Sequence, residues 1–388
     1  MPLPRATSTA PLRSFTTTAT GATEDEDGGV ITAWITFETA LARGHGLIRL
    51  KDGNIWTLLT SMVELKGFEE PLGFDRPHGV KHGAAKHRPT WTEEREAEAR
   101  TLGTTTQPQV LIIGGGQGGI APGARLRQLG VPTIIVEKND RPDDSWRNRC
   151  KSLCLHDPVW YDHLPYLPFP PNWPVFAPKD KIGDWLEMYT RIMELNYWTR
   201  TTCRSARHDE AKGEWSAVVD RDGQEVTLRP KELVLATSMS AKPNMPSFKG
   251  MERFKGDQHH SSRHPGPDAC RGKKAVVIGS NNSAPDICAA LWENDVDVTM
   301  VQRSSPLVAR SETLMDVGMA GLCSEAAVQG GMTTNKADMI FASLPYAILH
   351  EFQIPLYQEM KARDAGFHAA LEVAGSGWTG ATTIRACS

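Results

Sequence analysis

The stretch VLIIGGGQGGIAPGARLRQLGVPTIIVEK, from Val110 to Lys138, decides the fold of this chain. Its first four residues form an aliphatic run that is typical of a strand buried on both faces. A glycine-rich turn follows, then a helical segment that we expect to end at Gly130, then a second aliphatic run, VPTIIV. The order strand, turn, helix, strand predicts a βαβ unit of a parallel sheet, and therefore an α/β fold.

Three glycines of this turn, Gly114, Gly116 and Gly119, have the spacing GxGxxG. In a dinucleotide-binding unit the first permits the tight turn, the second lets the backbone approach a diphosphate, and the third lets helix and strand pack closely. Glu137 ends the next strand, where a carboxylate can accept hydrogen bonds from both ribose hydroxyls of an adenosine. The alternative is a βαβ unit whose glycines serve packing only.

A second stretch, KAVVIGSNNSAPDICAALWENDVDVTMVQRS from Lys274 to Ser304, is similar to the first. Its turn contains Gly279, Asn281 and Ser283, and we expect Asn281 to replace a glycine by adopting left-handed backbone angles. The next strand ends on Arg303 instead of an acid. Because a guanidinium binds a 2′-phosphate bidentately, this site is predicted to take NADPH. A surface arginine after a buried strand is the alternative.

Two such sites in one chain imply electron transfer between cofactors, and FAD is the natural hydride acceptor at the first site. The chain resembles the flavin-containing monooxygenases, in particular members with an N-terminal NTF2-like domain, from about Trp34 to Gly366. Besides the two turns, FKGDQHHSSRHP resembles the family's FxGxxxH signature, and LVLATSMSAKPNMP resembles its interdomain linker. The segment 144–147 resembles a flavin-contacting region. The resemblance implies that Trp146, Arg147 and Thr237 contact FAD.

In such enzymes NADPH reduces FAD, and the reduced flavin forms a C4a-hydroperoxide with O2 that inserts one oxygen atom into a small organic substrate. N-oxygenation, S-oxygenation and Baeyer–Villiger oxidation all stay open. Relatives often carry an asparagine near the flavin, and here His156 and Asp157 occupy the aligned positions. His156 and Asp157 are catalytic candidates, although either is equally compatible with a loop cap, and Asn282 in the second turn is a further candidate. Aromatic residues in 156–178 favour an apolar substrate.

The expected architecture is two Rossmann-like dinucleotide-binding domains, with the NADP domain inserted in the FAD domain, preceded by a short α+β segment. The expected bounds are a disordered tail (1–29), a partial NTF2-like module (30–73), a linker (74–108), the FAD domain (109–240), the NADP domain (241–366) and an irregular tail (367–388). The hairpin signal in the partial module is Asp52-Gly53. Because family members usually continue well beyond this length, we expect a C-terminally truncated family member.

Composition excludes several function classes. A net charge of −3 gives no electrostatic argument for nucleic acid, and no apolar run is long enough to predict stable membrane insertion. Seven scattered cysteines favour a reducing, cytoplasmic setting, and no Cys/His set has the spacing of a metal site. Oligomeric state is not readable from the sequence.

Two alternative functions stay open. Cys150 and Cys154, shortly after the first ribose acid, are compatible with a flavin-dependent dithiol oxidoreductase. The second alternative is an inactive fragment that binds dinucleotides without turnover.

Overall fold

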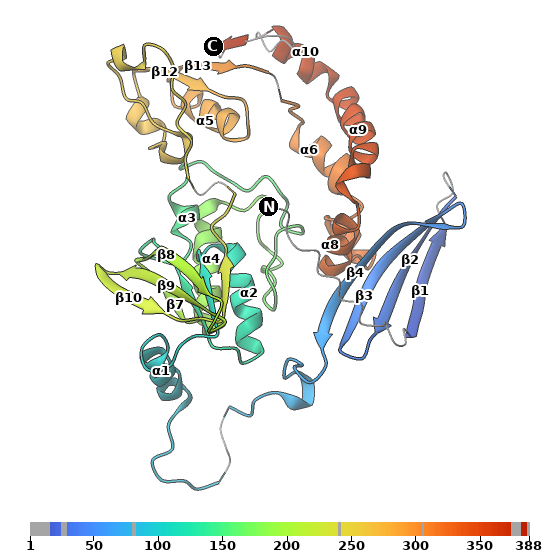
Figure 1. Ribbon diagram of the computed structural model, residues 1–388. Helices are drawn as coiled ribbons and strands as arrows, with labels where there is room; N and C mark the ends of the chain where they lie inside the picture. The colour runs from blue at the N-terminus through green and yellow to red at the C-terminus, as the bar shows by residue number, and fades with distance from the viewer. Residues whose placement is uncertain are drawn as a thin grey trace. The chain divides into compact units, whose positions relative to one another are not determined.

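The computed structural model describes residues 16–24, 29–79, 83–239, 242–304, 306–373 and 382–385. Chain contacts divide the protein into two units. The first comprises Met1–Arg76 and Glu325–Leu356, and the second comprises Pro77–Ser324 and Tyr357–Ser388. Parallel strand pairs joined by helices occur in the second unit, which confirms the α/β class (Figure 1).

The first unit is built on an antiparallel four-stranded sheet in chain order. Its strands are β1 (Thr16–Glu24), β2 (Val30–Glu38), β3 (Ala42–Lys51) and β4 (Asn54–Leu65). The predicted Asp52-Gly53 hairpin is confirmed, since both residues have positive φ (52° and 74°), as a two-residue primed turn requires. Helix α8 (Thr334–Ala342) packs on β3, and Arg49 Nη1 donates to Ser343 Oγ at 2.7 Å.

The tail prediction is wrong for Thr16–Glu24, which pairs with β2. The β-branched threonines of TTTATGATE suit a strand, and the next strand along the chain, β2, is its partner. The expected NADP domain also differs from the structure, because its residues 325–356 belong to the first unit. The expected linker contains helix α1 (Trp91–Thr101), which begins with a capping box at Thr90 and Glu93.

A four-stranded parallel sheet forms the centre of the second unit, in the order β11-β5-β6-β7. Its members are β5 (Val110–Ile113), β6 (Thr133–Val136), β7 (Tyr197–Trp198) and β11 (Glu232–Leu235). Helices α2 (Gln117–Gln128) and α4 (Lys179–Ile192) contribute to the apolar core that includes Ile112 and Ile135. A second core, which includes Leu111 and Ile134, involves an antiparallel meander. The meander consists of β8 (Thr201–Asp209), β9 (Glu214–Arg221) and β10 (Gln224–Leu228).

The strand order places a topological switch point at β5. The chain passes through α2 to β6 on one side of β5, whereas β11, much later in sequence, pairs on the other side. In open α/β sheets, ligands bind at the carboxyl ends of the strands where the order reverses. The glycine turn that follows β5 therefore stands where the fold places a ligand.

The second βαβ unit is smaller. It comprises β12 (Lys274–Ile278), α5 (Ser283–Trp292) and the parallel strand β13 (Asp297–Gln302). The prediction of an irregular tail over 367–388 is wrong for two parts: α10 (Ala365–Val373) is helical, and β14 (Thr382–Arg385) pairs antiparallel with β13. A strand this short in a Gly/Thr-rich context carries little periodicity, so only the available edge of β13 specifies it. The remaining helices are α3 (Asp144–Arg147), α6 (Ser311–Thr313), α7 (Glu325–Gln329) and α9 (Tyr346–Arg363).

Candidate functional site

The first glycine turn has the close contacts that the spacing predicts. Gly114 has φ +106°, and a Cβ there would lie 2.3 Å from the carbonyl oxygen of Ala236, just after β11. A Cβ on Gly119 would lie 2.0 Å from the carbonyl oxygen of Gly114. These two glycines are therefore required by the turn and by the packing of α2 against it.

Gly116 differs from these two glycines, because a side chain at this position would extend into open space. Here a Cβ would meet only Asp143 Oδ1 and Ser145 Oγ, both at 3.9 Å, and at Gly118 nothing lies within 4 Å. Gly116 is the N-cap of α2, a 12-residue helix whose first N–H groups lack intrahelical partners. This cradle of backbone amides and free space fits the diphosphate of a dinucleotide.

Glu137 directly follows β6 and is only 8% exposed. Its Oε2 accepts a hydrogen bond from the Gly115 N–H at 2.9 Å, and its Oε1 accepts one from the Asn139 N–H at 3.0 Å. Tyr197 closes the other side of the turn, since its hydroxyl donates to the Gly115 carbonyl at 2.7 Å. The acid predicted at the strand end is thus fixed against the glycine turn by backbone hydrogen bonds.

Asp143 is a site residue that sequence reasoning missed. It is 2% exposed, and among the described residues neither carboxyl oxygen has a hydrogen-bond partner. Burial, and next the carboxylate of Glu137, raise the pKa of Asp143 to about 8, although Arg147 acts in the opposite direction. Its φ of 59° is a signal of an unusual backbone position, but the sequence alone does not reveal it.

The other residues expected near FAD have different surroundings. Trp146 Nε1 donates to Gln117 Oε1, in the first turn of α2, at 3.1 Å. The Arg147 guanidinium is held by the acids of α3 and α4, at 2.9 Å from Asp184 and 2.8 Å from Glu187. Arg147 is therefore engaged in the scaffold of the site. Thr237 is exposed, and its backbone follows Ala236 beside Gly114.

The second turn is open to solvent. Gly279 has φ +134°, nothing lies within 4 Å of the position that a Cβ would take there, and its N–H donates to the Val301 carbonyl at 2.9 Å. The expectation for Asn281 is wrong, because its φ is not positive. Instead its Oδ1 accepts the Asn282 N–H at 2.9 Å, so the side chain shapes the turn by a local hydrogen bond. Ser283, the first residue of α5, is exposed.

Arg303 directly follows β13 and is exposed. Within the described part of the chain its guanidinium makes no hydrogen bond or ion pair. Because β12 and β13 are parallel, Arg303 and Gly279 both lie at the carboxyl edge of this pair. A free cation beside an open glycine turn fits a phosphate-bearing nucleotide.

One catalytic candidate, His156, contacts helix α5, whose N-cap is a second candidate, Asn282. His156 Nε2 lies 3.1 Å from Asp286 Oδ2 on α5. Asn282 precedes Asp286 by four residues, and therefore lies near it on the same helical face. Asp157 is exposed. Burial of Asp162 is the main cause that raises the pKa of Asp162 to about 6, and the carboxylate of Asp157 is the next cause.

Part of the aromatic segment 156–178 packs into the core. Phe169 stacks on Trp173 with ring centroids 4.5 Å apart and meets the edge of Trp185 of α4 at 4.7 Å. These rings belong to the core cluster around α2 and α4. Packing in the core therefore explains these two rings without a role in substrate binding.

The surroundings of Cys150 do not favour a reactive dithiol. Burial, and next the carboxylate of Asp286, raise the pKa of the Cys150 thiol. A reactive cysteine needs a lowered pKa, so this environment argues against the dithiol alternative.

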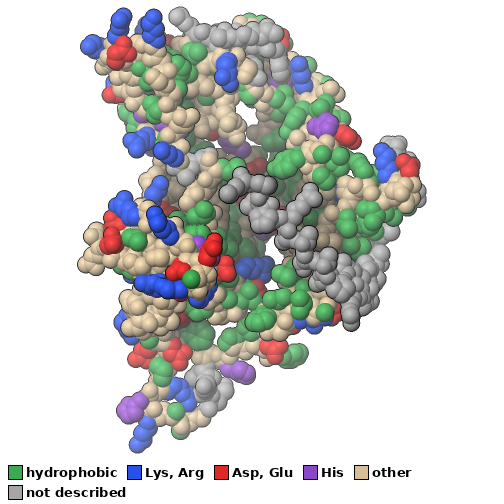
Figure 2. All heavy atoms as spheres, viewed as in Figure 1, with side chains coloured by type: hydrophobic (Ala, Val, Ile, Leu, Met, Phe, Trp, Pro, Cys, Tyr) green, Lys and Arg blue, Asp and Glu red, His purple; other side chains and the backbone are tan. Residues whose placement is uncertain are grey.

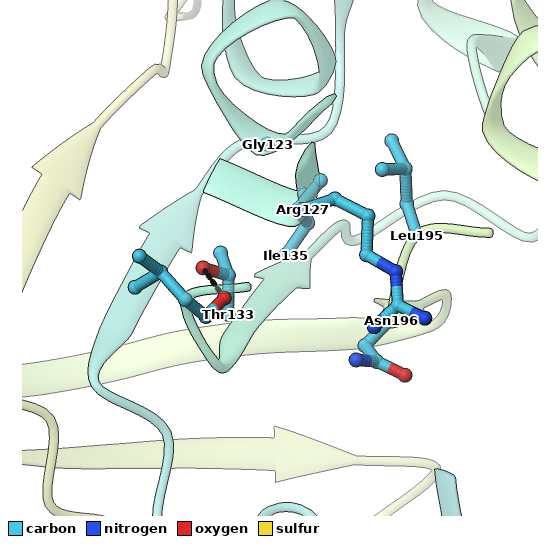
Figure 3. A pocket seen from close by; sticks show the side chains of 7 residues that line it. Gly123, Arg127, Thr133, Ile135, Leu195 and Asn196 are labelled. Carbon is cyan, nitrogen blue, oxygen red and sulfur yellow. Dashed lines mark hydrogen bonds between the residues drawn. The ribbon is translucent and has the colours of Figure 1, made fainter. Parts of the chain in front are cut away.

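Two hollows lie at the opposite edge of the sheet from the glycine turn. A cavity of about 10 Å³ is lined by Gly123, Thr133, Ile135 and Asn196, with Arg127 beside it (Figure 3). This volume holds at most one water molecule. A more open hollow of about 260 Å³ includes Pro132 and Leu102. Since both lie near the amino end of β6, neither is the dinucleotide crevice.

Surface charge and metal-ligand residue types give little further information about the function of this site. Figure 2 shows acidic and basic side chains intermingled on the face in view. In the described ranges, no group of three or more His, Cys, Asp or Glu side chains is arranged to hold a metal ion. Within those same ranges, every helix is too short or too polar to cross a membrane.

Comparison with known proteins shows a similarity over part of the chain. The model of the flavin-binding monooxygenase-like family matches residues 148–320. A relative from Oryza sativa subsp. japonica, indole-3-pyruvate monooxygenase YUCCA1, is 34% identical over 202 residues, which are 52% of this chain and 49% of that protein. Residues 148–320 are thus similar to flavin-binding monooxygenases.

The chain is also similar to the probable indole-3-pyruvate monooxygenase YUCCA9 of Arabidopsis thaliana, with 32% identity over 53% of this chain and 49% of the relative. The chain spans about half the length of these curated relatives. Among solved structures, a flavin-containing monooxygenase from Stenotrophomonas maltophilia is 25% identical with a TM-score of 0.47, covering 51% of this chain and 58% of that one. A structure of OTEMO in complex with FAD and NADP is 24% identical with a TM-score of 0.45, covering 51% and 39%.

Proposed function

We propose that the chain is an NADPH-dependent flavoprotein monooxygenase that transfers one oxygen atom of O2 to a small organic substrate. The observation that carries this proposal is the pair of glycine turns in one chain, one held against a buried glutamate and the other followed by an exposed arginine. The two turns differ at the position that distinguishes a ribose 2′-hydroxyl from a 2′-phosphate. A reducing, cytoplasmic setting is part of the proposal and rests on the scattered cysteines.

FAD would be held at the first turn, and it would supply hydride acceptance from NADPH and the activation of dioxygen. The N–H groups at the start of α2 would face the diphosphate, with space provided at Gly116 and Gly118. Glu137 would accept hydrogen bonds from the ribose hydroxyls, while it keeps the turn in place through Gly115. Trp146 and Gln117 would form one wall beside these amides.

NADPH would be held at the second turn. The exposed N-terminus of α5 would face its diphosphate, and Arg303 would bind the 2′-phosphate. His156 is the strongest catalytic candidate, because its hydrogen bond to Asp286 holds the imidazole next to the first turns of α5. There it would be positioned to hold a proton near bound nicotinamide, with Asn282 one turn away.

The test is an absorbance spectrum of the purified chain, followed by anaerobic addition of NADPH or NADH. Under the proposal the protein is yellow, and NADPH bleaches it much faster than NADH. Arg303→Ala is expected to remove that difference. Arg271→Ala is the matched control, because Arg271 precedes β12 at the opposite end of the strand and pairs with Asp268. A chain that stays colourless with added FAD would contradict the proposal and favour a fragment without turnover.

A further inference from the structure

The buried carboxyl group of Asp143 has no role in the function proposed above, and it stands beside the diphosphate cradle. Its Oδ1 lies 3.9 Å from the position that a Cβ would take on Gly116. That position marks the direction from which a diphosphate approaches the second glycine of the turn. Both carboxyl oxygens of Asp143 are buried and have no hydrogen-bond partner among the described residues.

The groups that face Asp143 favour its uncharged form. Glu137, at the end of β6, adds a negative charge, and Asp144 of α3 adds another. Arg147 is the opposing cation, but it is already paired with Asp144, Asp184 and Glu187. Tyr197 of β7 is neutral, and its hydroxyl is occupied by the Gly115 carbonyl. An ionised Asp143 would therefore stand uncompensated against two phosphate charges.

We propose that Asp143 sets the affinity of the first dinucleotide site: its protonated carboxyl donates a hydrogen bond to the bound diphosphate, and ionisation of that carboxyl repels it. The inference rests on the proposed FAD site. At pH values where the Asp143 carboxyl of the free protein is ionised, binding therefore takes up one proton. The first site is consequently weakened by alkaline pH, although nothing in the ligand's own diphosphate changes charge there.

The size of the effect follows from the fraction of protein that carries the proton. With the carboxyl of the free protein half-protonated at about pH 8, that fraction falls about tenfold between pH 7 and pH 9. Because the apparent Kd is the intrinsic Kd divided by the competent fraction, the Kd for FAD is expected to rise about tenfold over the same range.

The experiment titrates the FAD-free full chain with FAD by quenching of flavin fluorescence from pH 6.5 to 9. Asp143→Asn keeps a hydrogen-bond donor, removes the charge, and tolerates the positive φ of 59°. It is expected to bind FAD with a Kd that is independent of pH and about tenfold lower than that of the wild type at pH 9. Asp140→Asn, an exposed aspartate on the same loop, is the matched control and should keep the wild-type slope.

A wild-type Kd that stays constant over this range would overturn the inference, as would an Asp143→Asn protein that keeps the slope. Calorimetry of the wild type in two buffers of different ionisation enthalpy gives a second readout that needs no variant, with uptake of one proton per FAD expected at pH 9. Absence of proton uptake there contradicts the inference. Failure of every protein to bind FAD even at pH 6.5 instead refutes the proposed function on which the inference rests.

Discussion

Asp143 also predicts how the stability of the FAD-free protein depends on pH. Its pKa is raised from 3.8 in the unfolded chain to about 8 in the fold. Between these values the folded state binds more protons than the unfolded state, so the free energy of unfolding falls as pH rises. The slope for one such group is about −1.4 kcal/mol per pH unit, and the full difference across the window is on the order of 5 kcal/mol.

Asp143→Asn removes this single titration and leaves the backbone conformation accessible. We therefore expect the variant to gain stability relative to the wild type by about 1.4 kcal/mol per pH unit between pH 5 and pH 7.5. The difference between the two proteins is the useful quantity, because the titrations of all other groups cancel in it. Below pH 4 the two proteins should converge, apart from the change of carboxyl to amide.

The assay is urea unfolding of the FAD-free proteins at half-unit steps of pH, followed by tryptophan fluorescence. Most tryptophans lie in the second unit, to which Asp143 belongs. Asp140→Asn should follow the wild type at every pH, since Asp140 is exposed. Parallel pH profiles for the wild type and Asp143→Asn would refute the reasoning, because they would mean that the buried carboxyl has an ordinary pKa.

Three further predictions concern the two turns. Gly119→Ala should lower the free energy of unfolding by about 1–3 kcal/mol in thermal denaturation, because its Cβ would lie 2.0 Å from a carbonyl oxygen, whereas Gly118→Ala has free space and should be neutral or slightly stabilising; equal effects would contradict the packing role. Arg303→Ala should raise KM for NADPH by about 10- to 100-fold and leave KM for NADH nearly unchanged, as expected for loss of a charge-assisted hydrogen bond of about 1.5–3 kcal/mol; a similar rise for both coenzymes would rule out the 2′-phosphate assignment. Glu137→Ala should weaken FAD binding more than NADPH binding in parallel titrations, since two backbone amides of the first site lose their acceptor; a larger effect on NADPH would reverse the assignment of the two turns.

Some features of the two turns and their surroundings were only partly predictable from the sequence. The glycine spacing located Gly114 and Gly119 correctly, because a βαβ turn is specified by residues close together in sequence. Asn281 lies in the second turn, as expected, but the expected reason was wrong. Its side chain forms a hydrogen bond, and its backbone is not left-handed. Arg147 was expected at FAD, yet the acids that hold it come from α4, about forty residues further along the chain.

The sequence by itself determined the two βαβ units, their glycine turns and the contrast between Glu137 and Arg303. These features depend on periodicity and turn chemistry within about thirty residues, which local patterns encode. Only the tertiary structure decided that Asp143 is buried without a partner among the described residues, that β14 pairs with β13, and that α8 packs on β3. Burial and long-range pairing arise from segments that meet only on folding, and a carboxyl group acquires its altered proton affinity from that enclosure.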